Sequence, residues 1–370
     1  MASERVSIHG QWSSRLAFIL AATGSAVGLG NIWKFPYIAG ENGGGAFVLI
    51  YLGCIAVIGI PIMMAEVMIG RRGRQSPINT MRTLAAEEHA NRHWKWLGGA
   101  GVLAGFLILS YYSVIAGWAL SYVFRTASGL FTGLTADGVQ TIFTNLVSDP
   151  ERLLAWHTIF MIMTMVIVSG GVRNGLEKAV KLLMPSLFVL LLVLVGYAWN
   201  SGGFEQGVSF LFQPDFSKIT ANGILIAMGH AFFTLSLGMG AIMVYGSYLP
   251  DDASIAKTSI AVSLMDTLVA MLAGLAIFPI VFANGLEPGA GPGLIFQTLP
   301  IAFGHMQYGA FFGMLFFVLL VFAAWSSAIS LIEPAVAWLV ENRNMSRVFA
   351  SMVAGLATWS FGLLTVLSFN

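Results

Sequence analysis

Charged residues are scarce in this chain: Asp, Glu, Lys and Arg make up 9% of its 370 residues, whereas 57% are hydrophobic. Soluble domains carry about 25% charged residues, so most of this surface cannot face water. The formal net charge of +1 gives no reason to expect nucleic acid as a partner. The single cysteine, Cys54, excludes an intrachain disulfide, and we interpret it as a small apolar packing residue.

Long apolar runs recur along the whole chain, and the mean hydropathy is +0.81. A membrane-spanning helix needs roughly 20 predominantly apolar residues. In lipid, only helices and closed barrels satisfy their own backbone groups, so we predict an all-α, multi-pass membrane protein embedded in the lipid bilayer. The nine predicted spans cover residues 16–39, 47–69, 96–124, 154–169, 181–199, 219–248, 259–281, 309–338 and 348–367.

Lys and Arg are distributed unevenly between the predicted loops. Basic residues gather in the loops after the second, fourth and eighth spans and are few in the others. Loops rich in Lys and Arg stay in the cytoplasm. The N-terminus is therefore predicted to be cytoplasmic, with the chain in the inner (plasma) membrane of the cell.

Two of the predicted spans contain residues that interrupt a helix. The first holds Gly24, Gly28, Gly30, Asn31 and Pro36, and each glycine costs about 1 kcal/mol against alanine inside a helix. A dinucleotide-binding loop would need a preceding strand, which a membrane span does not provide. The alternative is close helix packing through small residues.

The sixth span has the same character between Gly229 and Gly240. The two interrupted spans are five apart, and each opens a set of consecutive spans. Inverted-repeat transporters place such broken helices at the bilayer midplane, where helix N-termini meet an anionic group and freed carbonyls bind a cation. We therefore predict a first repeat over residues 1–200, with spans one to five, and a second over 201–370.

Four motifs carry a resemblance to a known family. They are GSAVGLGNIWKFP at 24–36, ENGGGAF at 41–47, GIPIMMAE at 59–66 and FFTLSLGMG at 232–240. In this order they resemble the neurotransmitter:sodium symporter family, in particular its bacterial amino-acid branch, typified by the leucine transporter. The resemblance extends from Trp12 to the ninth span. It implies a leucine-transporter-type inverted five-span repeat and a sodium-coupled symporter that imports a hydrophobic or aromatic amino acid by alternating access, with a homodimer as a candidate assembly.

The resemblance also implies two sodium sites, and a dehydrated sodium ion requires hard oxygen ligands. The first ion would be held by the Ala26 carbonyl, by the side chains of Asn31, Thr234 and Asp266, and by the substrate carboxylate. A second ion would use the following carbonyls and hydroxyls: Gly24, Val27, Ala323, Ser326 and Ser327. By itself, a Ser-Ser pair in a helix also fits hydroxyls bonded to their own helix, and this alternative stays open.

For the substrate, the resemblance implies a zwitterion site at the two breaks. Its carboxylate would be received by the N–H groups of Leu29 and Gly30 and by the Tyr112 hydroxyl. The amino group would contact the carbonyls of Ala26, Phe233 and Thr234 and the Ser236 hydroxyl. The side-chain pocket would be lined by Ile108, Phe233, Met239, Ser327 and Leu331. Without the resemblance, Tyr112 and Phe233 would be ordinary packing aromatics.

Asp266 is a carboxylate in the middle of a predicted span. Insertion scales assign such a residue a cost of about 2.5–3.5 kcal/mol, so it is a functional candidate, the alternative being a structural acid paired with a neighbouring span. Chloride-dependent relatives bind that anion beside residues matching Tyr51, Thr234 and His230, the last of which could equally be a core residue. Two sodium ions and a zwitterion carry +2, and a fixed carboxylate lowers this to +1, as chloride would. We therefore predict chloride-independent transport, with Asp266 protonated on the empty return step.

Candidate gating residues lie on either side of this site. Lys34, with Tyr112 and Phe233, would close the outer side, and its acidic partner in the leucine transporter lies on a tenth span. Glu66 would bond the unwound part of the sixth span, the alternative being a surface acid. On the inner side His9 would pair with Glu341.

Family members usually have eleven or twelve spans, so the second repeat, with spans six to nine, lacks a tenth span. We expect this nine-span chain to be a truncated piece of a longer protein, the alternative being a short variant whose missing wall comes from elsewhere. The alternative function is a non-transporting, sodium-dependent amino-acid-binding fragment. A membrane-embedded protease needs a Ser/His or a paired-Asp constellation on facing spans. Ser236 and His230 are six residues apart on one broken helix, and no second aspartate pairs with Asp266 on a facing span. An enzyme is therefore not expected.

Overall fold

The computed structural model describes residues 5–288 and 293–369, and these residues form helices joined by short loops without any β-strand. The α-helices are α1 (Arg15–Ala26), α2 (Phe35–Glu41), α3 (Gly45–Cys54), α4 (Ile60–Gly73), α5 (Pro77–Glu87), α6 (Lys95–Ala127), α7 (Ala136–Val147), α8 (Pro150–Ser169), α9 (Lys178–Trp199), α10 (Phe204–Phe212), α11 (Ala221–Thr234), α12 (Ala241–Ser247), α13 (Ile255–Ala283), α14 (Leu299–His305), α15 (Gly309–Arg343) and α16 (Arg347–Leu367). Segments of π-helix at Gly30–Lys34, Ile55–Gly59, Val172–Glu177 and Leu294–Thr298 precede or join some of them.

Seven continuous helical segments of the described chain are long and apolar enough to cross a membrane. Each coincides with a predicted span and generally extends a few residues beyond it. These segments are Gly45–Gly73, Arg92–Ala127, Pro150–Ser169, Val172–Trp199, Ile255–Ala283, Gly309–Arg343 and Arg347–Leu367. The first predicted span is a broken pair, Arg15–Ala26 and Gly30–Glu41, bent by 50° at the interruption.

The sixth predicted span is divided more completely. Helices α11 and α12 are separated by residues 235–240, and neither is long enough to cross a membrane alone. The backbone of Ser236, Gly238 and Gly240 is left-handed there, with φ of 55°, 76° and 74°. Only glycine adopts this conformation without steric cost, so the two glycines explain why the helix stops and restarts.

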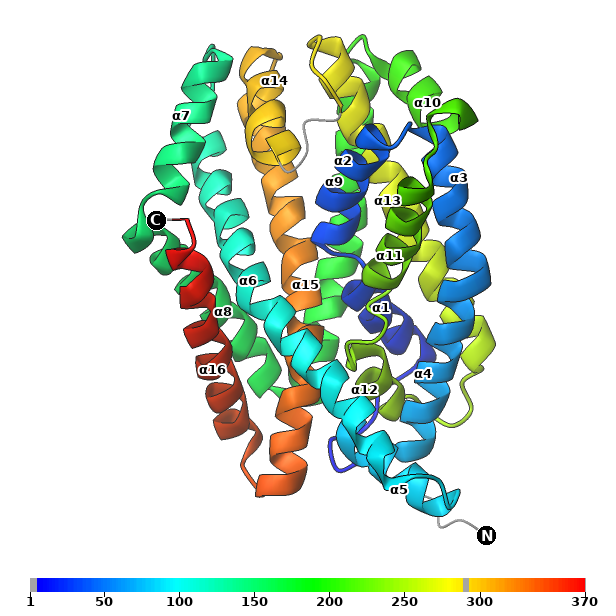
Figure 1. Ribbon diagram of the computed structural model, residues 1–370. Helices are drawn as coiled ribbons and strands as arrows, with labels where there is room; N and C mark the ends of the chain where they lie inside the picture. Colours follow the sequence, from blue (N-terminus) through cyan, green and yellow to red (C-terminus); the bar gives the residue numbers. More distant parts are fainter. Residues whose placement is uncertain (1–4, 289–292, 370) are drawn as a thin grey trace.

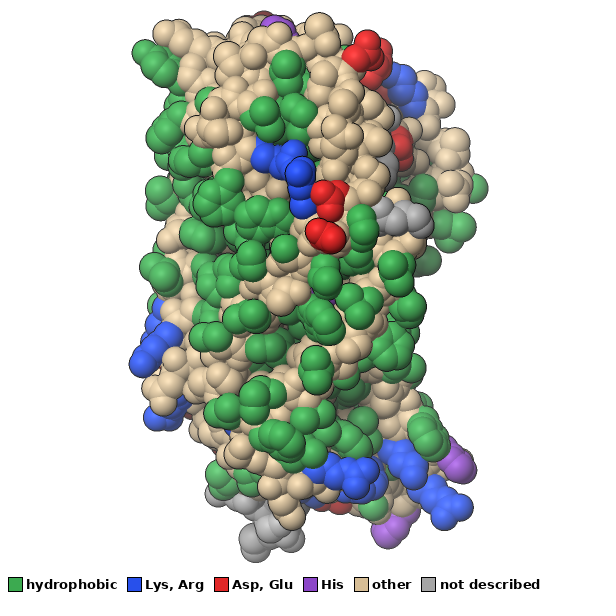
Figure 2. All heavy atoms as spheres, turned by 90° about the vertical axis from the view of Figure 1, so that its left-hand side faces the viewer, with side chains coloured by type: hydrophobic (Ala, Val, Ile, Leu, Met, Phe, Trp, Pro, Cys, Tyr) green, Lys and Arg blue, Asp and Glu red, His purple; other side chains and the backbone are tan. Residues whose placement is uncertain are grey.

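Of the broken helices, α1 and α12 are largely buried in the bundle, whereas α11 lies at its front in Figure 1 and leaves Leu225 61% exposed. Long helices α6 and α15 pack along each other, α4 packs on α12, and α16 lies at one edge against α8. The short helices α7, α10 and α14 gather at one end of the bundle, and α5 lies at the other, near the N-terminus. Figure 2 shows hydrophobic side chains predominating over the middle of one outer face, as expected for a surface in contact with lipid.

One apolar element falls between the predicted spans 259–281 and 309–338. The π-helical segment Leu294–Thr298 and helix α14 bury Phe296 and Leu299 against the bundle, and the Tyr122 hydroxyl donates a hydrogen bond to the Phe296 carbonyl at 3.0 Å. This segment is shorter than a span, so a search for runs of about 20 apolar residues does not detect it.

Replacing Gly238 by alanine should strain the left-handed backbone. No atom lies within 4 Å of the added Cβ, so any loss of stability would come from the left-handed backbone and not from a clash. We expect about 1 kcal/mol of destabilisation. Gly229→Ala is the matched control, because Gly229 lies inside α11 with equally free space and a helical backbone. Thermal unfolding in detergent measures both, and an equal effect of the two would contradict the assignment of the break to Gly238.

Candidate functional site

The two interruptions lie against each other and are held by side chain to backbone hydrogen bonds. At the first, the Asn31 Oδ1 accepts the N–H of Gly28 at 3.1 Å. At the second, the Ser236 hydroxyl donates to the Ser25 carbonyl at 2.8 Å, joining the two breaks. The side chains therefore replace helical hydrogen bonds that the breaks remove.

The predicted first sodium site is a cluster of oxygen-bearing side chains around Asp266. Asn31 Nδ2 donates to Asp266 Oδ1 at 2.8 Å, and the Thr234 hydroxyl lies 3.1 Å from both carboxylate oxygens. Asn31 and Asp266 are completely buried. No group of three or more His, Cys, Asp or Glu side chains suitable for a metal occurs in the described chain. Hydroxyl and carboxylate oxygens, such as those of Thr234 and Asp266, suit sodium. The Asn31 side chain directs its NH2 to Asp266 and its oxygen to the Gly28 N–H, so the predicted amide ligand does not face the cluster in this structure.

The predicted second sodium site joins the end of α1 to α15. The Ser327 hydroxyl donates to the carbonyls of Val27 and Ser25, each at 3.1 Å, and approaches that of Gly24 at 3.5 Å. The Ser326 hydroxyl lies 3.1 Å from the Ala323 carbonyl and 3.5 Å from that of Val27. The contacts of Ser327 cross between helices, so bonding to its own helix does not account for its hydroxyl.

A small cavity of about 20 Å³ lies between these two clusters. This is room for about one water molecule, so an amino acid can enter only if the lining side chains move apart. Its lining comprises Ser25, Ala26, Gly28, Gly30, Ile108, Tyr112, Phe233, Thr234, Ser236, Met239, Ser327 and Leu331. The predicted substrate residue outside this lining, Leu29, donates its N–H to the Tyr112 hydroxyl at 3.1 Å.

Ser25 and Gly28 are lining residues that the sequence analysis did not select. Gly28 faces the side chains of the opposite wall: a Cβ there would lie 2.4 Å from the Ser327 hydroxyl oxygen and 2.8 Å from that of Tyr112. The motif already marked Gly28 as a helix breaker, but its close approach to α6 and α15 depends on tertiary packing.

The side of the cavity that was predicted to face outward is closed by two aromatic side chains. Tyr112 and Phe233 line both this cavity and a second one of about 190 Å³, so they separate the two spaces. The Lys34 Nζ lies 4.8 Å from the centre of the Phe233 ring, within the range of a cation–π contact. Within residues 5–288 and 293–369, Lys34 forms no ion pair.

On the opposite side the predicted inner pairs are in contact. His9 Nε2 lies 3.1 Å from Glu341 Oε1, and Glu341 also accepts hydrogen bonds from the Ser76 N–H and from Asn79 Nδ2, each at 2.6 Å. Glu66 accepts the N–H of Gly238 at 2.7 Å. A glutamate thus holds the unwound part of the sixth span, in place of the alternative of a free surface acid.

A second buried ion pair was not predicted. Glu333 of α15 is completely buried and pairs with Arg347 at the start of α16, and the Tyr248 hydroxyl donates to it at 2.7 Å. Arg347 Nε also donates to the Val168 carbonyl of α8 at 2.9 Å. Glu333 lies within the predicted span 309–338, so the charge criterion that selected Asp266 could have found it.

His230 lies within the aromatic core beside the Asp266 cluster. Its ring centre is 5.9 Å from that of Phe35 and 5.4 Å from that of Tyr51. The side chain is buried, and neither ring nitrogen has a hydrogen-bond partner among the described residues. These contacts favour the interpretation of His230 as a core residue, but one that lacks, within the described chain, the hydrogen bond that was expected of it.

Comparisons with known proteins agree with this geometry. The model of the sodium:neurotransmitter symporter family matches residues 9–133 and 141–368. The chain therefore belongs to this family of sodium-dependent transporters and is not an enzyme.

Individual relatives resemble most of the chain. The sodium-dependent transporter YhdH of Bacillus subtilis is 40% identical over 360 residues, covering 97% of this chain and 79% of its own. A sodium-dependent transporter of Haemophilus influenzae is 38% identical over 342 residues, covering 91% of this chain and 75% of its own. The crystal structure of MhsT in complex with L-phenylalanine has a TM-score of 0.89 and 47% identity, covering 98% of this chain and 81% of that one.

Replacing Glu333 by glutamine should leave the Arg347 charge buried without its counterion. Breaking a buried pair in this way costs about 3–5 kcal/mol, so the thermal midpoint in detergent should fall strongly. Lys218→Gln, which removes one partner of an exposed pair with Asp215, should leave the midpoint unchanged. If Glu333→Gln unfolds at the wild-type temperature, the pair is not a structural link between α15 and α16.

Proposed function

We propose that this chain is a sodium-coupled symporter that imports a hydrophobic or aromatic amino acid by alternating access. The observation that carries the proposal is the meeting of the two broken helices around a small, mainly apolar cavity, with an oxygen cluster on each side of it. The binding of L-phenylalanine by MhsT supports the same class of substrate.

Coupling between sodium and substrate follows from shared residues. Thr234 lines the cavity and also contacts Asp266, so an ion in that cluster would lie beside the substrate. Ser327 lines the cavity and also contacts α1 carbonyls. An ion at either cluster would therefore fix groups that the substrate contacts, and binding of one would favour binding of the other.

The orientation of the substrate follows from the broken first span. The N–H of Leu29 precedes the helical segment that begins at Gly30, and the positive end of a helix favours an anion. A substrate carboxylate would take this N–H and the hydroxyl of Tyr112. The apolar side chain would then face Ile108 and Met239, and the flexible thioether of Met239 can adapt as the cavity expands.

Chloride independence is part of the proposal. Asp266 lies beside Tyr51, whose hydroxyl donates to it at 3.5 Å, so a carboxylate provides negative charge next to the first ion cluster. Two sodium ions and a zwitterion would then leave a net charge of +1 without chloride, and protonation of Asp266 would neutralise the empty site during its return.

Alternating access would open one side of the cavity at a time. Outward opening requires Phe233 and Tyr112 to separate, and inward opening requires the His9–Glu341 contact to break. The inverted repeat, the cytoplasmic N-terminus, the plasma membrane location and a homodimer remain predictions of the sequence. The second candidate, a fragment that binds but does not transport, differs only in whether bound substrate crosses a membrane.

Binding of labelled leucine, tyrosine, tryptophan and phenylalanine to purified protein should saturate in sodium and be absent in potassium. Ser327→Ala removes a proposed ligand and should raise the sodium concentration for half-maximal binding at least tenfold. Ser360→Ala, an exposed hydroxyl on α16, should not change it. Equal binding in potassium and sodium would refute the proposed coupling. Substrate accumulation in proteoliposomes under an inward sodium gradient then separates transport from binding alone.

Uptake into the same proteoliposomes should be unchanged within about twofold when gluconate replaces chloride. Asp266→Asn should weaken sodium-dependent binding at least tenfold, because it removes the negative charge beside the ion, whereas Asp252→Asn in an exposed loop should have no effect. A large loss of wild-type uptake in gluconate would show that chloride is required.

A further inference from the structure

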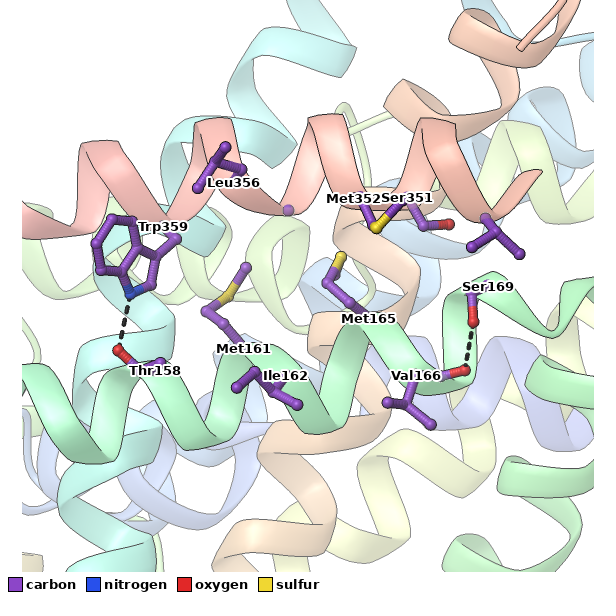
Figure 3. A pocket seen from close by; sticks show the side chains of 12 residues that line it. Thr158, Met161, Ile162, Met165, Val166, Ser169, Ser351, Met352, Leu356 and Trp359 are labelled. Atoms are coloured by element: carbon purple, nitrogen blue, oxygen red, sulfur yellow. Dashed lines mark hydrogen bonds between the residues drawn. The ribbon is translucent and has the colours of Figure 1, made fainter. Parts of the chain in front are cut away.

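A groove between α8 and α16 lies on the outer face of the bundle, away from the transport cavity. Its volume is about 570 Å³. Figure 3 shows Met161 and Met165 of α8 and Met352 of α16 pointing into the space between the two helices. Side chains at the rim of the groove are exposed, such as Val166 at 66%, whereas Met161 on its floor is only 3% exposed.

The length of the groove matches one leaflet of a bilayer. Its lining on α8 runs from Thr158 to Ser169, and eleven residues at 1.5 Å each give about 16 Å. The hydrocarbon core of a bilayer is about 30 Å thick, so the groove spans about half of it. One acyl chain fits this length.

The lining suits a flexible hydrocarbon chain. None of the side chains that line the groove is charged, and thioethers adapt to irregular apolar shapes. The two helices touch at the floor, where a Cβ on Gly355 would lie 2.5 Å from the Met165 sulfur. Lipid tails are as apolar as the groove, so burial of a chain provides little driving force within a membrane. Selective binding must therefore depend on the headgroup.

Three arginines lie at or near, in sequence, the helix ends that meet at one end of the groove, and one of them, Arg347, is paired with Glu333. Ser169 ends α8 there and α16 begins at Arg347, whose side chain lies 3.6 Å from a Cβ built on Gly171. Arg173 and Arg343 are exposed nearby in sequence to these helix ends. Within the described chain neither of them forms an ion pair.

Two polar groups at this end also have no partner. The Ser351 hydroxyl, on a completely buried residue that lines the groove, has no hydrogen-bond partner in the described structure. Arg347 uses Nε and Nη2 in the contacts described above, but its Nη1 has none. These unpaired donors, together with Arg343 and with Arg173, whose Nε donates to the Gln11 carbonyl at 3.1 Å, are suited to the ester and phosphate oxygens of a lipid.

We propose that this groove binds one acyl chain of an anionic phospholipid, with the phosphate held by Arg173 and Arg343. The charge complementarity at one end and the leaflet length of the apolar part together identify the occupant. Zwitterionic lipids with the same acyl chains should bind more weakly, because their positively charged group offsets the attraction between the phosphate and the arginines.

The test measures lipid binding to the purified, delipidated full chain by native mass spectrometry. Titration with dioleoyl phosphatidylglycerol should show one retained lipid, bound at least fivefold more tightly than dioleoyl phosphatidylcholine. Val166→Trp and Met352→Trp fill the groove from opposite rims, and each should weaken phosphatidylglycerol binding at least fivefold. Leu364→Trp, on a residue of α16 that is 65% exposed and outside the groove, is the matched control and should bind as wild type.

The headgroup is tested separately. The double variant Arg173→Gln, Arg343→Gln should reduce the preference for phosphatidylglycerol over phosphatidylcholine to less than twofold, whereas Arg82→Gln, on the exposed surface of α5, should retain it. Equal binding of the two lipids by wild type, or wild-type binding by both groove-filling variants, would overturn the proposal. So would displacement of the lipid by soluble glycerol phosphate alone. A dimer that becomes monomeric on Met352→Trp would instead identify the groove as a contact between two copies.

Discussion

The backbone groups released by two interrupted helices are the constraint on which the rest of this structure depends. Inside a membrane these groups have no water to bind, so protein or a ligand must satisfy them. Asn31, Ser236 and Glu66 provide some of the required bonds, each from a side chain to the backbone of a break. The carbonyls that remain, and the N–H groups at the restarted helix, are the groups that a cation and a carboxylate can use.

Buried charge is the second feature that links structure to function. Asp266 is surrounded by donors at the proposed ion site, and Glu341 is contacted by three polar residues, His9, Ser76 and Asn79. Glu333 has a full counterion in Arg347 and joins α15 to α16. Asp266, which we propose as an ion ligand, thus differs from Glu333 and Glu341, which join elements of the bundle through their partners.

The cavity between the breaks is too small for the proposed substrate, and this follows from the packing of Phe233, Tyr112 and Met239 around it. Entry of a substrate therefore requires these side chains to move apart. The contacts of Glu341 with His9, Ser76 and Asn79 lie away from this lining.

The sequence alone determined the membrane-spanning segments, because about 20 apolar residues in succession have no other stable environment. It also located both breaks, since Gly28, Asn31, Gly238 and Gly240 oppose a continuous helix, and the family motifs indicated most of the cavity lining. Only the tertiary structure decided which charges pair, how far the cavity is closed, and that α8 and α16 leave a groove between them. Pairing and cavity volume depend on distances between residues far apart in the chain, such as Ser25 and Ser236 or Tyr248 and Glu333. Hydropathy and motif spacing contain no information on those distances.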